Sequence, residues 1–407
     1  MFSLFYTIGI RFYYLSIRIA SIWNPKAKKW IAGRKSIPDD IEKITSGSKE
    51  IIWFHCASVG EFEQGYPLLK MLRNEYPKYA FHITFFSPSG YDFVKQKYPT
   101  ESISFLPNDI NADLYYFIRK IKPKAVILVK YEIWYRLIKL LNESAIPTFL
   151  ISGFFRPDHF YFKWYGIPFI QSLKKLNHLF LQEEKSQTLL HSIGVDNTTV
   201  VGDTRFDRVI ETCLLDFQDS IIENFIQKSP VFIAGSVWES DQIVLNKIIQ
   251  SLPSDWKIIL APHEFAHYNT DWIQEKTHFY TKEKENNARI LILDTMGLLS
   301  RIYRYASLTY VGGGFDKGLH NILEPAVYHK PILIGPNFSK FNEAVQLVKL
   351  ECVFVVENNE KTSILIQKLI YDIPFLDAIQ TKLETFISAN TNVSDKIAVY
   401  LRKNKIF

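Results

Sequence analysis

An acidic residue just after a predicted strand is the first candidate for chemistry. Residues 51–57 are apolar and predict a strand, and the small residues Ser58 to Gly60 form a turn into a predicted helix whose first acidic side chain is Glu61. A carboxylate at such a corner faces the ligand-binding edge of a sheet, where it can act as a general base. It can equally stabilise the N-terminus of the helix, which favours a negative charge. The pattern leaves both interpretations open.

A second candidate stretch, residues 310–343, carries three consecutive glycines, Gly312-Gly313-Gly314, directly after a short apolar strand. Glycines followed by a polar loop, a short helix and a second strand predict a βαβ unit with a ligand-binding crevice at its strand ends. The backbone can approach a ligand closely there, and helix N-terminal amides favour a phosphate. Asn321 with Glu324 also resembles a helix capping box, so a purely structural interpretation stands beside this one.

Residues 263–267 match the H-E-x-x-H pattern of zinc peptidases, in which His263 and His267 would hold the metal and Glu264 would activate water. The motif follows Pro262 at the end of a predicted strand, Thr270 replaces the glycine of the extended motif, and the sequence indicates no third ligand. We therefore favour a ligand-binding loop in which His263 or Glu264 contacts the ligand, and keep zinc chemistry as an alternative.

Two α/β domains are needed to position these residues. The length of 407 residues suits about two domains, and apolar runs alternate with helix-like stretches in two series. The predicted fold class is therefore α/β, with two Rossmann-like domains at 36–210 and 211–407 and the functional site in the cleft between them. The strands are expected at 51–57, 82–86, 103–106, 125–129, 148–151 and 179–181, and then at 231–234, 257–261, 290–293, 308–311, 331–334 and 353–356.

Residues 1–35 form a separate, basic and apolar segment. No acidic residue precedes Asp39, and the polar residues of the first turns follow one another at steps of three or four, as one stripe on an apolar helix. Such a helix can lie at a membrane surface, where its arginines meet anionic headgroups. A single span is the alternative, although it would bury two arginines in hydrocarbon. The stripe comprises Ser3, Thr7, Arg11, Tyr14, Arg18 and Ser21.

Other classes of protein do not fit the sequence. It contains neither a P-loop nor the G-x-G-x-x-G fingerprint, which argues against kinases and NAD enzymes. The net charge of +6 is mild and the basic residues are not clustered with aromatic ones along the body of the chain, so nucleic acid is not an expected partner. The three cysteines are far apart, which predicts neither a disulfide framework nor a cysteine zinc site.

Taken in order, several short motifs resemble the 3-deoxy-D-manno-octulosonic acid (Kdo) transferases of lipopolysaccharide synthesis. The resemblance extends over nearly the whole chain, and the combination is more specific than any single piece. The motifs are Trp30-Ile31-Ala32-Gly33-Arg34, Ser58-Val59-Gly60-Glu61, Glu132-Ile133-Trp134, Gly202-Asp203-Thr204-Arg205-Phe206-Asp207, Asp294-Thr295-Met296-Gly297 and Gly318-Leu319-His320-Asn321 with Glu324-Pro325.

The resemblance implies a GT-B fold, CMP-Kdo as donor and a lipid A precursor of the lipid IVA type as acceptor. Glu61 is then the general base of an inverting transfer, which needs no metal or other cofactor, at the cytoplasmic face of a bacterial inner membrane. The implied donor-binding residues are Ser236, His263, Met296, Gly297, Gly313, His320, Asn321 and Glu324, and the implied acceptor-binding residues are Ser58, Gly60, Glu132, Trp134 and Arg205.

Two departures from the family pattern concern charge. Pro262-His263-Glu264 stands where Pro-Arg-His is usual, which removes the expected phosphate-facing arginine, and Arg205 stands where lysine is usual. Another nucleotide-sugar transferase with a lipid acceptor remains the nearest alternative, followed by a membrane-associated binding protein without activity.

Overall fold

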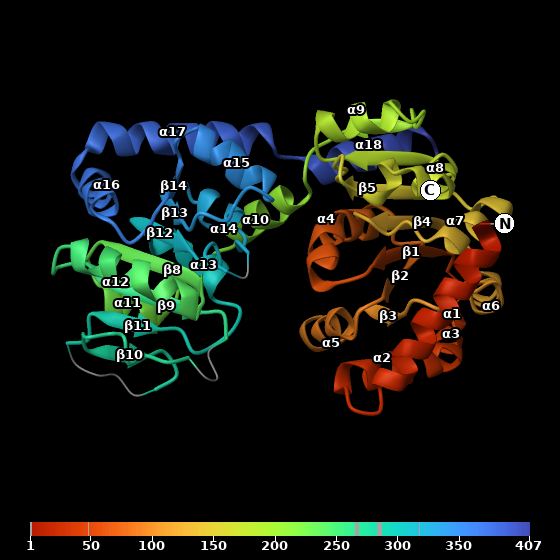
Figure 1. Ribbon diagram of the computed structural model, residues 1–407, viewed down its shortest axis with the longest axis horizontal. Coiled ribbons are helices and arrows are strands. Elements are labelled where there is room, and N and C mark those ends of the chain that lie inside the picture. Colours follow the sequence, from red (N-terminus) through yellow and green to blue (C-terminus); the bar gives the residue numbers. More distant parts are fainter. Residues whose placement is uncertain (1, 48, 265–267, 283–286, 317) are drawn as a thin grey trace. The chain divides into compact units, whose positions relative to one another are not determined.

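The computed structural model describes residues 2–47, 49–264, 268–282, 287–316 and 318–407. It divides into two compact units (Figure 1). The first comprises Met1–Arg208 with Asn392–Phe407, and the second comprises Val209–Thr391. Each unit contains one parallel sheet of seven strands with helices packed against it.

The first unit has the strand order β3-β2-β1-β4-β5-β6-β7, whose first six positions match the order of a Rossmann fold. Both faces of this sheet are covered, which is why its central strands are apolar without alternation. The strands are β1 (Ile51–Cys56), β2 (Ala80–Phe85), β3 (Ser102–Phe105), β4 (Pro123–Val129), β5 (Thr148–Gly153), β6 (His178–Leu181) and β7 (Thr198–Val200).

Successive residues of β1 point to opposite faces of the sheet. Trp53 packs in a core with α3, α6 and α7, whereas Phe54 packs in a second core with α4, α5 and α18. The helices of this unit are α1 (Phe2–Ala20), α2 (Pro25–Lys35), α3 (Ile37–Thr45), α4 (Val59–Glu75), α5 (Pro88–Lys97), α6 (Asn111–Ile121), α7 (Tyr135–Glu143), α8 (Ile167–Leu173), α9 (Glu184–His191) and α18 (Val393–Lys403). Helix α10 (Arg205–Leu214) leads into the second unit.

The second unit repeats this architecture with the strand order β10-β11-β9-β8-β12-β13-β14. The strands are β8 (Val231–Val237), β9 (Lys257–Pro262), β10 (Thr277–Phe279), β11 (Ile290–Ile292), β12 (Leu308–Val311), β13 (Ile332–Ile334) and β14 (Val353–Val355). The helices are α11 (Ser220–Ile226), α12 (Gln242–Ser251), α13 (Leu299–Ile302), α14 (Leu323–Ala326), α15 (Asn342–Lys349), α16 (Glu360–Tyr371) and α17 (Ile373–Ala389).

The prediction of two α/β domains with parallel sheets is confirmed, and every expected strand overlaps an observed one. The prediction missed β7 and β10, which are three-residue strands at the edges of their sheets. The expected cleft between the domains stays a prediction. Among the described residues no helix is long and apolar enough to cross a membrane.

The chain returns to the first unit at its C-terminus, which differs from the expected domain of residues 211–407. Helix α18, blue in Figure 1, buries Val393, Ile397 and Leu401 in the core that includes α4. Its first turn is capped from a distance, because Asp207 on α10 accepts hydrogen bonds from the backbone N–H groups of Val393, at 3.1 Å, and Ser394, at 2.6 Å. A terminal apolar stripe and a long-range cap thus decide which unit this helix joins.

Replacing Asp207 by alanine should lower the free energy of unfolding of the first unit. The two backbone donors of α18 would lose their partner, which for a helix cap costs about 1 to 2 kcal/mol. Urea unfolding followed by circular dichroism measures the loss. Asp395→Ala is the matched control, because Asp395 is exposed in the same turn and should change stability by less than about 0.5 kcal/mol. Equal losses in both variants would contradict the capping role.

Candidate active site

Glu61 lies in the first turn of α4, just beyond the carboxyl end of β1. One of its carboxylate oxygens accepts a hydrogen bond from the backbone N–H of Ser58 at 2.9 Å, as in a capping box. Burial and the neighbouring charge of Glu132 raise the pKa of Glu61, while His55 and backbone hydrogen bonds oppose that rise. Glu61 therefore stabilises the N-terminus of α4, as one of the two interpretations predicted. Its raised pKa also makes it a stronger base than an exposed glutamate.

Glu132 joins this site through a buried network. It follows β4 and accepts a hydrogen bond from Trp134 Nε1 at 2.6 Å, and it lies 3.0 Å from His55 Nε2. The other ring nitrogen of His55 contacts the backbone oxygen and the hydroxyl of Thr84 on β2. Three neighbouring strands, β2, β1 and β4, thus contribute side chains to one hydrogen-bonded chain. His55 was not singled out from the sequence, and this role was therefore missed.

The remaining residues expected to bind the acceptor differ in their surroundings. Gly60 is exposed, and a Cβ atom added there would meet no atom within 4 Å. Arg205 is engaged by Asp203, whose carboxylate lies 2.8 Å from its Nε and 2.7 Å from its Nη2. Burial would raise the pKa of Asp203, but Arg205 outweighs burial and lowers it. Ion pairing therefore fixes the guanidinium before any ligand arrives.

In the second unit the three glycines pack against protein backbone. A Cβ atom on Gly312 would lie 2.3 Å from the backbone oxygen of Ser236, and one on Gly313 would lie 2.3 Å from that of Gly318. Gly313 also has a φ of +89°, which favours glycine. Gly313 is buried and its N–H donates to Asp241 at 3.1 Å, and its place in the donor site stays a prediction.

Asp241 holds this end of the sheet together and was missed by the sequence analysis. Its carboxylate accepts hydrogen bonds from the backbone N–H of Trp238 at 2.8 Å and of Gly313, and from the hydroxyl of Tyr310 at 2.7 Å. Ser236, just before this turn, has a φ of +53°, an unfavourable value for a residue with a side chain. Strain of this kind is common at functional sites, which suits its expected place in the donor site.

Three aromatic rings stack beside that turn. The ring centroid of His263 lies 4.3 Å from that of Trp238 and 4.5 Å from that of His320. Trp238 Nε1 donates a hydrogen bond to His320 Nε2 at 2.8 Å, so this nitrogen carries no proton. Burial, followed by His263, lowers the pKa of His320 to about 4. The two expected donor residues are thus brought together, and Trp238 is a third member that the sequence analysis missed.

The other expected donor residues divide into two groups. Asn321 and Glu324 form a local pair, in which Asn321 Nδ2 donates to Glu324 Oε1 at 3.3 Å and Asn321 Oδ1 accepts from the backbone N–H of Leu323 at 3.2 Å. The helix that follows, α14, has Ile322 as its N-cap without a side-chain cap hydrogen bond, so this pair is not the capping box that the spacing also suggested. Met296 is 78% exposed, and a Cβ atom on Gly297 would meet nothing within 4 Å. These two residues lie in an open loop after β11.

A cavity of about 330 Å³ adjoins Trp238. Glu239, Glu264 and Asp316 line it, so its charge does not suit a phosphate, whereas the imidazole rings beside it can donate hydrogen bonds to one. No group of three or more potential metal ligands occurs among the described residues, and His267 of the H-E-x-x-H motif lies outside them.

The stability of the second unit should depend on pH through His320. Its pKa is about 4 in the folded chain against an ordinary 6.5, so the unfolded chain binds the extra proton between these values. The free energy of unfolding should therefore be greatest above pH 6.5 and decrease as the pH falls towards 4. Urea unfolding followed by tryptophan fluorescence at several pH values measures this.

His320→Gln, which stays neutral throughout, should flatten that dependence. His82, buried in the first unit with a pKa of about 3, contributes a similar slope to that unit, so unfolding of the two units is compared separately. An unchanged pH dependence of the second unit in His320→Gln would mean that the imidazole is not held neutral as its contacts indicate.

Comparison with known proteins identifies relatives of this chain by sequence. The family model described as 3-Deoxy-D-manno-octulosonic-acid transferase (kdotransferase) matches residues 32–208. A 3-deoxy-D-manno-octulosonic acid transferase of Haemophilus influenzae is 26% identical over 76% of this chain and 75% of its own length. A bifunctional glycosyltransferase/methyltransferase of Fusobacterium nucleatum is 25% identical over 88% of this chain, which spans 56% of that relative's length.

Solved structures with the same fold include a UDP-GlcNAc 2-epimerase of Neisseria meningitidis bound to UDP-GlcNAc. It covers 87% of this chain and 100% of its own, with a TM-score of 0.62 at 14% sequence identity. This likeness shows the fold alone, which is of the GT-B-like kind with two Rossmann-like units. The sequence matches go further: they make the chain similar to Kdo transferases over most of its length, and this similarity supports a glycosyltransferase activity.

Proposed function

We propose that this enzyme transfers Kdo from CMP-Kdo to a lipid A precursor of the lipid IVA type, with inversion at the anomeric carbon. The observation that carries the proposal is the half-buried carboxylate of Glu61 at the carboxyl end of β1, whose pKa is raised by burial and by Glu132. A base must accept a proton from a sugar hydroxyl during attack, and a raised pKa strengthens the carboxylate for that task.

The reaction balances without any further reagent. The Glu61 carboxylate takes the proton of an acceptor hydroxyl as that oxygen bonds to the anomeric carbon of Kdo. The bond between this carbon and the phosphate oxygen breaks, and CMP leaves with the bonding electrons. Attack from the face opposite the leaving phosphate inverts the configuration. Ser58 supports the role of Glu61, because its backbone N–H binds one carboxylate oxygen and so orients the side chain.

The donor is proposed to bind to the second unit through Ser236, His263, His320, Asn321 and Glu324. The stacked rings support this proposal, because imidazole N–H groups and ring faces suit a nucleotide phosphate and base. They also offer hydrogen-bond donors where the usual arginine is replaced by His263. Glu324, beside Asn321, is a suitable acceptor for the ribose hydroxyls. Helix N-terminal amides and side-chain donors can stabilise the leaving phosphate, so no metal is required.

The acceptor is proposed to bind to the first unit near Glu132, Trp134 and Arg205. A lipid acceptor requires the enzyme at a membrane, and residues 1–35 are the part of the chain suited to that contact by their charge and apolar content. Peripheral attachment at the cytoplasmic face of a bacterial inner membrane follows from this proposal.

Glu61→Gln should reduce Kdo transfer by about 10² to 10⁴-fold, the usual contribution of a general base. Glutamine retains the oxygen that accepts from Ser58, so the fold should persist. Transfer is measured with purified protein, a tetra-acylated lipid A precursor and CMP-Kdo generated in place. Glu63→Gln, two residues along the same helix, is the control and should keep its activity. Equal activity of Glu61→Gln and the wild type would show that another group is the base.

Because the pKa of Glu61 is raised, the wild-type rate should also fall at a higher pH than an ordinary glutamate would give. Protonation removes the base, so activity is lost as the pH drops through that raised pKa.

Chelation distinguishes this mechanism from zinc chemistry at His263 and Glu264. Transfer should survive EDTA without loss, because backbone amides and side chains stabilise the leaving phosphate. The assay is the same Kdo transfer, together with metal analysis of the purified protein. Activity that disappears with EDTA and returns with Zn²⁺ would refute the metal-free mechanism.

A further inference from the structure

A basic and aromatic pocket in the first unit takes no part in the site described above. It has a volume of about 390 Å³ and lies between α1 and α2, next to the turn that precedes α6. Four of its ten lining residues are arginine or lysine and none is acidic. The cationic residues are Arg11, Arg18, Arg34 and Lys35, and the others are Tyr14, Leu15, Trp30, Ile31, Asn108 and Ile110.

Two buried donors in the wall of this pocket have no hydrogen-bond partner among the residues that the structure describes. Trp30 is only 7% exposed, and its indole Nε1 is without a hydrogen-bond acceptor, as is Nε of Arg34. A buried polar group without a partner is costly, so such groups usually mark a place where a ligand or water binds. Asn108 Oδ1 is also unpartnered, which provides an acceptor for a hydroxyl at the same site. The pocket therefore offers N–H donors and positive charge to an anion.

Arg34 is fixed in position before any ligand binds. Its guanidinium lies 3.5 Å from the ring centroid of Trp30, and Nη2 donates to the backbone oxygen of Phe86 at 3.4 Å. Burial lowers the pKa of Arg34 to about 9, with Tyr14 and Tyr13 opposing that fall, so it stays charged at neutral pH. A preorganised guanidinium is well suited to a phosphate group.

Helix α1, beside the pocket, presents its apolar side away from the protein. Three residues of its polar stripe face inward: Arg136 Nη2 donates to the backbone oxygen of Ser3 at 2.9 Å and to the hydroxyl of Thr7, and the backbone N–H of Asp109 donates to the hydroxyl of Tyr14 at 2.7 Å. The exposed large apolar side chains on and just after this helix are Leu4, Phe5, Ile8, Phe12, Tyr13, Leu15, Ile19, Ile22 and Trp23.

We propose that this pocket binds the phosphate of an anionic membrane phospholipid while the outward side of α1 rests among the lipid chains. Leu15 belongs both to the pocket and to the exposed apolar side, so headgroup and acyl chain would be contacted by one continuous surface. A free phosphate would use the charges but leave that apolar surface in water. Interfacial helices combine these two contributions, apolar burial and attraction to anionic headgroups.

The pocket is linked to the proposed active site through packed rings. Phe86 lies 5.8 Å from Trp30 and 5.0 Å from Trp134 between ring centroids, and Trp134 donates to Glu132. A headgroup held at Trp30 would therefore keep the acceptor side of the first unit at the lipid surface. This consequence rests on the proposed function, whereas binding of the headgroup does not.

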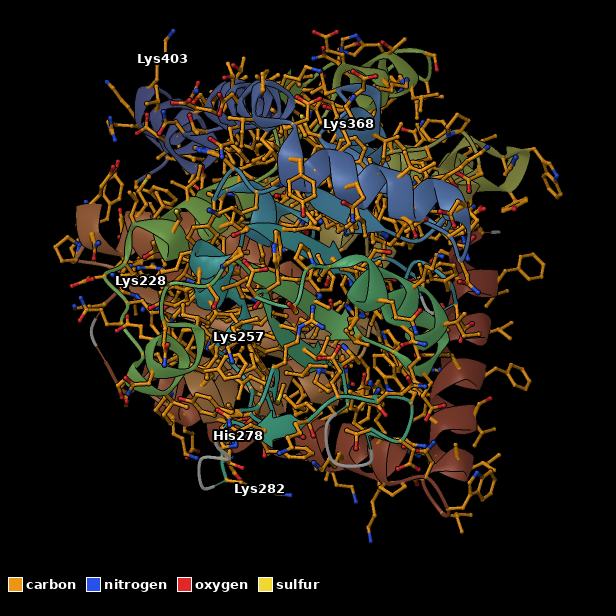
Figure 2. All side chains as sticks on the ribbon, turned by 90° about the vertical axis from the view of Figure 1, so that its left-hand side faces the viewer. Lys228, Lys257, His278, Lys282, Lys368 and Lys403 are labelled. Carbon is orange, nitrogen blue, oxygen red and sulfur yellow. The ribbon has the colours of Figure 1, made fainter. Side chains whose placement is uncertain are left out.

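Flotation of the full-length protein with vesicles tests the proposal. We expect binding to vesicles that contain phosphatidylglycerol and much weaker binding to phosphatidylcholine alone. Arg11→Gln with Arg18→Gln should weaken binding to the anionic vesicles by about 30-fold, since each basic side chain near such a surface contributes a factor of about five. Lys228→Gln with Lys403→Gln, which removes the same charge at two exposed positions labelled in Figure 2, should leave binding unchanged.

Two further variants separate the contributions. Phe12→Ser with Trp23→Ser should weaken binding to every vesicle that binds, whereas Ile243→Ser, a comparably exposed side chain on α12, should not. Trp30→Phe keeps an aromatic ring but removes the unpartnered N–H. It should weaken binding only to vesicles that contain phosphatidylglycerol. Equal binding by the arginine and lysine variants would overturn the proposal.

Competition identifies the source of the phosphate. Inorganic phosphate that displaces the protein at low concentration would make this a site for free phosphate and overturn the lipid assignment. A second experiment uses phosphatidylcholine vesicles that carry the lipid A precursor. If the arginine variants lose binding to these vesicles but retain it on phosphatidylglycerol, the pocket binds the acceptor and the proposal fails. Kdo transfer to detergent-dispersed acceptor, measured on the same variants, reports separately on the proposed function.

Discussion

The contact between His55 and Glu132 is the interaction on which the first unit's site depends. A carboxylate that is only 8% exposed needs partners, and Glu132 has His55 and Trp134 on one oxygen. Because His55 comes from β1 and Glu132 follows β4, the contact fixes the ends of two neighbouring strands. The effect of Glu132 on Glu61 is electrostatic: its charge adds to burial in raising the pKa of Glu61, while His55 opposes that rise. A side chain that caps a helix thereby becomes a better base.

The second unit uses a buried carboxylate for a different purpose. Asp241 receives three hydrogen bonds, from Trp238, Gly313 and Tyr310, and so ties the loop after β8 to the turn after β12. The glycines of that turn have no room for a side chain, since Gly312 approaches the backbone of Ser236. Packing of this kind brings Trp238 and His320 within hydrogen-bond distance. Contacts within the second unit therefore determine the conformation of the loops at these strand ends.

The sequence predicted the sheets well because strands buried on both faces are continuous apolar runs, as in 125–129. Three-residue edge strands such as β7 carry too little of that pattern to be found. The glycine cluster was recognised as a constraint, but the sequence did not show that the backbone of Ser236 is a close neighbour of Gly312. Trp238 and Asp241 were missed because their roles depend on Tyr310 and His320, some 70 to 80 residues away.

The polar stripe of α1 was predicted from spacing, but spacing does not determine which side of the helix packs against the protein. Such a stripe normally faces water. Here the body of the unit buries Asp109 and Arg136; Thr7 accepts a hydrogen bond from the guanidinium of Arg136, and Tyr14 accepts one from the backbone N–H of Asp109. Satisfying buried polar groups matters more than hiding an apolar stripe, because an unpaired buried charge is the costlier arrangement. The apolar stripe is consequently left outside, next to arginines, and this combination is the one that a lipid surface can satisfy on both counts.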